Sequence, residues 1–191
     1  MAYLTRSQLE AMGFKHLGQN VKVSDKASIY NADQISIGDE SRIDDFCTVS
    51  GKVTIGRNVH IAVYVNVAGG EPGITFGDYS AIAYGSHIFA QSDDYLGYAM
   101  TNPTVPDRYK KETKLPIVVG RHTLIGTNCV IFPGVTFGEG TAVGACSLVT
   151  RDTAPWSVYT GIPAKWVKER RKDLLLMEED YVRSGYAPDS V

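Results

Sequence analysis

Two adjacent aspartates and a tyrosine, Asp93, Asp94 and Tyr95, stand in the stretch "GSHIFAQSDDYLGYAM", residues 85–100, where a regular repeat breaks off. A carboxylate can act as a general base when burial or a like-charged neighbour raises its pKa. It is a weak base for an alcohol, but it can hold an ammonium group and later accept its proton. The pair therefore favours an amine substrate over a hydroxyl. A structural role as turn caps stays open, because aspartate is common where a chain leaves regular structure.

The chain on both sides of this break repeats every six residues. A period of six fits neither a helix nor plain strand alternation, but is typical of a parallel solenoid in which three hexapeptides form one triangular coil. One aliphatic or aromatic residue per hexapeptide points inward, and a small residue two places earlier fills the remaining space. The inward series comprises Ile37, Ile43, Val49, Ile55, Ile61, Val67, Phe76, Ile82, Ile88, Val119, Ile125, Ile131, Phe137, Val143 and Val149. The small series comprises Ser41, Cys47, Ser80, Ser86, Thr123, Cys129, Thr141 and Ser147.

Two histidines precede inward residues of this series and are therefore expected to point outward. His87 lies six residues before Asp93 and is an alternative base, or else an interface residue. His60 belongs to the second hexapeptide of its coil and His87 to the third, so the two are expected on different faces. His16 and His122 are expected to be surface residues.

The segments outside the repeat are expected to be helical or looped. Residues 1–16 predict a short helix with Thr5 as N-cap, Gln8 completing a capping box and Gly13 as a stop signal. Residues 163–184 predict a C-terminal helix, whose helically spaced Trp166, Val167, Leu174 and Leu175 are expected to lie against the solenoid. The tail after it is expected to fray. The long excursion 89–116 predicts a protruding loop, since ligands cannot enter a filled prism and must bind where loops leave it. A purely structural trimerisation arm is the alternative.

The repeat and the closing stretch "VTRDTAPWSVYTGIPAKWVK", residues 149–168, resemble the hexapeptide-repeat acyltransferases over roughly residues 18–168. The resemblance is closest to the branch of galactoside, maltose and xenobiotic O-acetyltransferases and the related nucleotide-sugar N-acyltransferases. It implies a mainly β protein, a left-handed parallel β-helix over residues 17–162. It also implies a homotrimer whose sites lie between neighbouring subunits. The implied reaction moves an acyl group, most simply acetyl, from coenzyme A to an amino or hydroxyl group of a sugar, nucleotide-linked, in surface polysaccharide synthesis.

Matching positions carry the family's site residues onto this chain. The O-acetyltransferases place a basic histidine on the loop in a context like "TGHP", where this chain has Asp93 followed by Asp94. The resemblance therefore assigns catalysis to these acids, with His87 as the other candidate. Acceptor contacts are expected from Tyr95, His60, Tyr84 and Met100. The expected coenzyme A contacts are Thr127 and Ala145 beside the pantetheine arm, with Thr150, Arg151, Lys165 and Lys168 towards the adenosine and phosphates.

Composition and charge narrow the functional classes to which the protein could belong. A formal net charge of −2 gives no bulk electrostatic case for nucleic acid or for an anionic membrane, and no apolar run approaches the ~20 residues of a spanning helix. The start lacks a signal peptide's apolar core, and the three cysteines form no CxxC pair, so a cytoplasmic location is expected. No metal site is expected. Three alternatives stay open: O-acetylation of free sugars or xenobiotics, a non-catalytic trimeric scaffold, and a metal-dependent hydratase.

Overall fold

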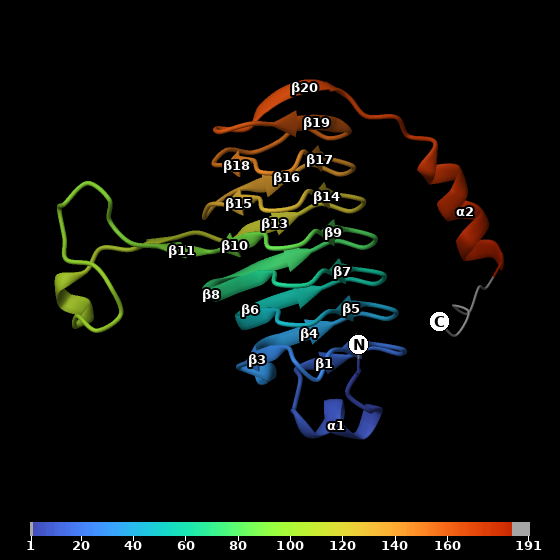
Figure 1. Cartoon of the computed structure of the whole chain (residues 1–191), viewed down its shortest axis with the longest axis horizontal. Coiled ribbons are helices and arrows are strands. Elements are labelled where there is room, and N and C mark those ends of the chain that lie inside the picture. The colour runs from blue at the N-terminus through green and yellow to red at the C-terminus, as the bar shows by residue number, and fades with distance from the viewer. Residues whose placement is uncertain (1, 185–191) are drawn as a thin grey trace.

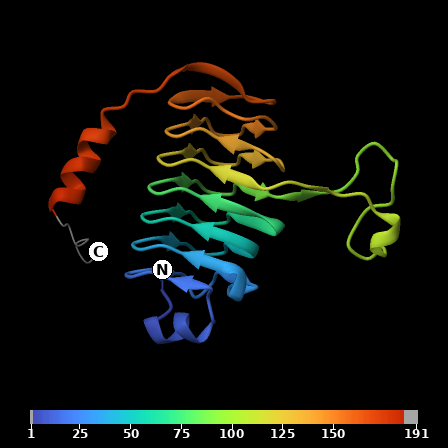
Figure 2. The ribbon, with the colours of Figure 1, turned by 180° about the vertical axis from the view of Figure 1, so that it is seen from behind.

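A computed structural model describes residues 2–184 of the chain. Short parallel strands stack into a three-sided solenoid, with a small helix, α1 (Arg6–Ala11), under its first coil (Figure 1). A long loop projects from one side of the solenoid, and a second helix, α2 (Leu174–Ser184), stands beside another (Figure 2).

The strands form three faces, which we call A, B and C in chain order within a coil. Strands β6 (Thr48–Ile55) and β8 (Asn66–Phe76) bend from face A onto face B, so faces A and B join into one sheet of ten strands. Face A also contains β3 (Ser28–Tyr30), β10 (His87–Phe89), β15 (Val130–Ile131) and β18 (Leu148–Val149). Face B also contains β1 (His16–Leu17), β4 (Ile35–Ile37), β13 (Ile117–Val119) and β16 (Thr136–Phe137).

Face C is the second large sheet, with eight strands. It runs through β2 (Lys22–Val23), β5 (Arg42–Ile43), β7 (His60–Ile61), β9 (Ala81–Ile82), β14 (Leu124–Ile125), β17 (Ala142–Val143), β19 (Ser157–Thr160) and β20 (Lys165–Glu169). Outside the faces lie two 3₁₀ turns, Ala32–Gln34 and Asp107–Tyr109, and a two-stranded ribbon of β11 (Gln91–Ser92) and β12 (Thr113–Lys114).

The interior confirms the six-residue repeat. Every residue of the predicted inward series is buried, with no more than 3% of its surface exposed, and so is every residue of the small series. Most of the small polar side chains form a hydrogen bond to the next coil. Ser86 Oγ, for example, donates to the carbonyl of Gly126 at 2.8 Å and accepts from the N–H of Cys129 at 3.1 Å. The prism is therefore filled, and chemistry must take place on its outside.

The N-terminal helix follows its sequence signals. Thr5 is the N-cap, and Thr5 and Gln8 form both halves of the capping box. Gly13 follows the helix at φ +72°, a conformation that glycine adopts without steric cost.

The predicted C-terminal helix is wrong over its first half. Residues 165–169 form β20, which pairs antiparallel with β19, and the helix begins only at Leu174. The last coil leaves backbone groups of β19 without a strand on that side, and β20 supplies the partner. Trp166 and Val167, which helical spacing assigned to a buried face, are 56% and 46% exposed. The tail predicted to fray lies, from residue 185 onward, outside the described residues.

Candidate active site

Tyr84, Thr127 and Ala145 lie in one column along the edge where face C meets face A. Their turns stack directly on one another: the N–H of Asn128 donates to the carbonyl of Tyr84, and the N–H of Cys146 to that of Thr127, each at 2.8 Å. Tyr84 is 57% exposed, so its ring points away from the prism. The structure thus brings one expected acceptor residue into line with two expected pantetheine contacts.

The loop leaves the solenoid at a different edge, where face A meets face B. The ribbon β11–β12 forms its base, and a cavity of about 490 Å³ opens beside that base. Asp93, Asp94, Tyr95 and Thr150 all contribute to its lining, together with Phe132. The structure therefore joins the two loop acids to one of the expected donor residues.

The two acids differ in what holds them. Asp94 accepts from the backbone N–H groups of Leu96 at 2.8 Å and Ala99 at 2.9 Å, and these bonds, that of Leu96 foremost, lower its pKa. Asp94 is therefore a turn cap that stays ionised, and no like-charge repulsion raises its pKa as the sequence suggested. Asp93 receives one long bond, from the N–H of Asn102 at 3.3 Å, and so keeps most of its hydrogen-bonding capacity for a ligand.

The rest of the loop stands clear of the solenoid (Figure 2). Tyr95 and Tyr98 are each 80% exposed, and Met100 is 56% exposed. Apolar side chains of this size are rarely presented to water in a group without a binding role.

His87 and His60 lie on different faces, as the repeat predicts. His87 is exposed on face A, where β10 aligns it with Asn66 and Val130. His60 lies on face C in β7, and its Nε2 is 2.8 Å from a carboxylate oxygen of Asp44. Neither histidine lines the cavity beside the loop acids.

The remaining donor residues do not gather in one groove of a single chain. Arg151 is exposed and follows Thr150 at the edge between faces A and B. Lys165 and Lys168 are exposed on β20, on face C, opposite Thr160 and Val158 of β19. The expected donor positions therefore fall on two edges and one face of the prism.

Comparison with known proteins decides the family. No protein-family model matches the chain. The dTDP-4-amino-4,6-dideoxy-D-glucose acyltransferase of Escherichia coli is 44% identical over 188 residues, which are 97% of each chain. A crystal structure of a variant of AntD, an N-acyltransferase from Bacillus cereus, holds dTDP-4-amino-4,6-dideoxyglucose and coenzyme A. It matches with a TM-score of 0.95 at 42% identity, over 96% of this chain and 98% of that one. AntD with dTDP and 3-hydroxybutyryl-CoA matches with a TM-score of 0.94 at 40% identity, over 97% and 98% of the two chains.

This chain is a hexapeptide-repeat acyltransferase. The predicted fold, a left-handed parallel β-helix, is confirmed with the family, and so is acyl transfer to a sugar from a coenzyme A thioester. Family membership sets aside the scaffold and hydratase alternatives. Residues 2–184 of the acyltransferase contain no cluster of three or more histidine, cysteine or acidic side chains that could hold a metal ion, and no helix there is long and apolar enough to cross a membrane.

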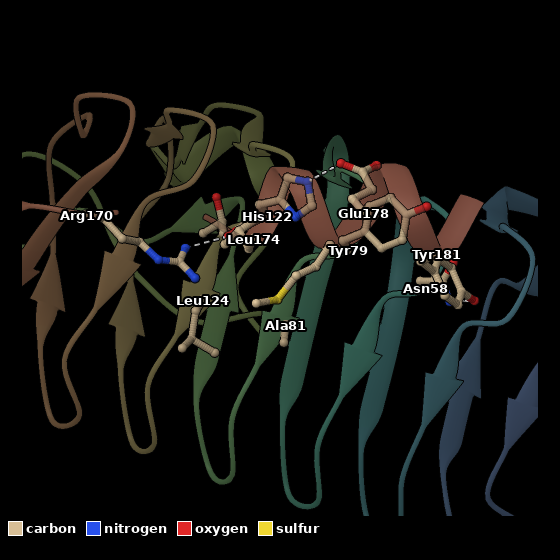
Figure 3. Close-up of a pocket in the computed structure, with 11 residues that line it drawn as sticks. Asn58, Tyr79, Ala81, His122, Leu124, Arg170, Leu174, Glu178 and Tyr181 are labelled. Atoms are coloured by element: carbon tan, nitrogen blue, oxygen red, sulfur yellow. Dashed lines mark hydrogen bonds and ion pairs between the residues drawn. The ribbon is translucent and has the colours of Figure 1, made fainter. Parts of the chain in front are cut away.

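The acyltransferase also has a cleft that the sequence did not predict, between α2 and face C, with a volume of about 580 Å³ (Figure 3). His122, expected at the surface, is only 8% exposed there, and its Nε2 is 2.9 Å from a carboxylate oxygen of Glu178 on α2. Tyr79 stacks on the imidazole ring with centroids 5.2 Å apart. No local signal could have found this site, because its two halves are 56 residues apart in the chain.

Proposed function

We propose that this acyltransferase acylates the 4-amino group of dTDP-4-amino-4,6-dideoxyglucose. The observation that carries the proposal is the 44% identity, over nearly the whole chain, to an enzyme of that name. The loop acids support it independently, because the site offers carboxylates where the hydroxyl-acylating branch offers an imidazole.

Asp93 is the group that engages the amine. A sugar amine arrives protonated, and a carboxylate with open lone pairs holds the ammonium and accepts its proton. The neutral nitrogen then attacks the thioester carbonyl carbon, and the electron pair moves to oxygen in a tetrahedral intermediate. Collapse breaks the C–S bond and forms the amide, the attacking nitrogen gives up one further proton, and the departing thiolate takes up that proton. Asp94 contributes by fixing the loop through Leu96 and Ala99.

The site is shared between subunits of a homotrimer. Two observations support this arrangement. The loop carries exposed tyrosines away from its own solenoid. The expected donor positions of one chain lie on two separate edges and on face C, so that a groove between neighbouring copies would combine positions from both chains. The enzyme works in the cytoplasm, where acyl-CoA is available and its three free cysteines stay reduced.

Acyl transfer measured by mass spectrometry tests the proposal. The amino sugar nucleotide and its 4-hydroxy counterpart are offered with acetyl-CoA and with 3-hydroxybutyryl-CoA. Mass detection is preferable to thiol reagents, because Cys146 is itself exposed. We expect an N-acyl product from the amino sugar alone. Acylation of the hydroxy sugar at an equal rate would contradict N-specificity, and activity on neither would contradict the acceptor class.

A further inference from the structure

One position on face C breaks a rule that the other coils of this face follow as far as the sixth. The residue after the inward side chain is small in the first coil and again from the third coil to the sixth: Ser24, Ala62, Ala83, Gly126 and Gly144. In the second coil this residue is Asp44, and it is 1% exposed. A buried carboxylate is costly unless it is paired, and departures of this kind from a local rule are expected at functional sites.

Asp44 is paired with two side chains that face outward. Its carboxylate accepts from Arg42 Nε at 2.5 Å and Nη2 at 2.9 Å, and it is bonded to His60 Nε2 at 2.8 Å. Arg42 and His60 are neighbours in register on β5 and β7, and their side chains remain 43% and 41% exposed. The buried carboxylate thus fixes the orientation of two donors at the surface while leaving them accessible.

The outer surface of face C changes character along the solenoid. Its first three outward residues are Lys22, Arg42 and His60, whereas from β9 to β19 the aligned residues are Ala81, Leu124, Ala142 and Val158. The nearby acid Asp45 is occupied by Ser24 and by Lys26 at 3.6 Å. Among the strands from β2 to β19, only those at the N-terminal end of this face therefore suit an anion, and the cations Lys165 and Lys168 on β20 lie at the opposite end.

Along the solenoid axis, this end of face C lies next to the coil from which the loop leaves. His60 aligns with Ala81 in β9, the strand that leads into the Tyr84 turn and then to the loop. His60 is thus one strand spacing, about 4.8 Å, and Arg42 two spacings from the coil that carries Tyr84. The expected pantetheine contacts, Thr127 and Ala145, lie on the opposite side of that coil. In the proposed site shared with the loop of a neighbouring copy, an acceptor that reacts at the level of the loop would therefore extend towards Arg42.

We propose that Arg42 and His60 bind the diphosphate of the nucleotide-linked acceptor, with Asp44 as the residue that positions both. The proposal rests on the proposed function, because the acceptor class is taken from it. A guanidinium fixed by a carboxylate at two nitrogens still has N–H groups free for phosphate oxygens, and such charge-assisted bonds are strong.

Binding of dTDP alone, measured by calorimetry on the full chain, tests the subsite without requiring catalysis. Arg42→Ala and His60→Asn should each weaken dTDP binding by about 10- to 150-fold, the range of one hydrogen bond to a charged group. Coenzyme A binding is the internal control and should not change. Arg57→Ala is the matched control variant, since Arg57 is exposed at the edge between faces B and C and stacks on Tyr79.

The outcomes separate this subsite from the proposed function. A wild-type protein that binds coenzyme A but no dTDP would overturn the acceptor class, and the subsite with it. Wild-type binding of dTDP that survives both Arg42→Ala and His60→Asn would overturn the subsite alone. For Asp44→Asn we expect weaker dTDP binding with unchanged coenzyme A binding, whereas a merely structural role would lower the melting temperature and leave dTDP affinity intact. If that variant does not fold, Arg42→Lys keeps the charge but loses the two-nitrogen hold. It should also weaken dTDP binding, and wild-type affinity would contradict positioning by Asp44.

Discussion

The solenoid and the loop between β10 and β13 obey opposite rules. In the solenoid each coil repeats the previous one, side chains of one kind fill the interior, and polar groups find partners on the next coil. In the loop, large aromatic side chains are exposed and two carboxylates stand together. The comparison indicates that the repeat supplies rigidity, whereas its interruption presents the candidate reactive side chains.

The largest effect should come from the loop acid with free hydrogen-bonding capacity. Asp93→Asn keeps the size of the side chain but removes its charge, so we expect kcat/KM to fall by roughly 10²–10⁴-fold, the contribution of a general base. Asp94→Asn should cost less, because Asp94 serves the turn.

Steady-state kinetics on the amino sugar nucleotide measure both variants, with His87→Asn as the control. If His87→Asn abolished activity while the two aspartate variants kept it, the imidazole would be the base and the loop acids would be caps only.

The second-largest effect should be a loss of folding stability, and we expect it for substitutions in the solenoid but not for those in the loop. Ile131 is fully buried, and Ile131→Ala should lower the free energy of unfolding by about 2–5 kcal/mol through lost burial and a cavity. Arg108 is exposed on the loop and stacks on Tyr109. Arg108→Ala should therefore change the free energy of unfolding by no more than about 0.5 kcal/mol. Chemical denaturation measures the free energy of unfolding of both variants. Equal losses of stability in Ile131→Ala and Arg108→Ala would contradict the difference between a rigid solenoid and a loop that adds little stability.

A smaller effect is expected at the donor end. Lys168→Ala and Arg151→Ala should each raise the KM for acyl-CoA by about tenfold with little change in kcat, because the phosphates are remote from the reacting carbonyl. Unchanged KM in both variants would show that the positions carried over from the family are wrong.

The smallest effect is expected where α2 meets face C. Burial alone would raise the pKa of Glu178, but hydrogen bonds from His122 and Arg121 outweigh it and lower the pKa below 4.5. Because the pKa of Glu178 is lower in the folded than in the unfolded protein, its ionised form stabilises the folded state above pH 4.5. This stabilisation is lost as the pH falls through the pKa of the folded state. The protection factors of the amides in α2, which correct exchange for its intrinsic pH dependence, should therefore fall on acidification, by at most about fivefold for an ion pair worth ~1 kcal/mol or less. In Glu178→Gln this acid response should disappear; if it persists, another group holds the helix.

Features that depend on residues close together in the chain could be predicted from the sequence, whereas features that depend on distant residues could not. Core positions such as Ile88 and the cap at Thr5 depend on neighbours a few residues away, and both were confirmed. Strand β20 was mistaken for helix because its pairing with β19 outweighs the local spacing of apolar residues. The contact of His122 with Glu178 is out of reach of local patterns. Asp44 was within reach, because the repeat itself marks it as an exception.

The two ends of the solenoid have a further consequence. Below the first coil lies α1, and above the last coil β20 runs antiparallel to every strand beneath it. Without these covers, the final coil of one molecule could continue into the first coil of another, because parallel coils offer the same pairing pattern at both ends. These two covers, α1 and β20, therefore set the length of the solenoid. They prevent the end-to-end growth into fibres that the repeat would otherwise permit, so that only the sides of the solenoid are left for association between copies.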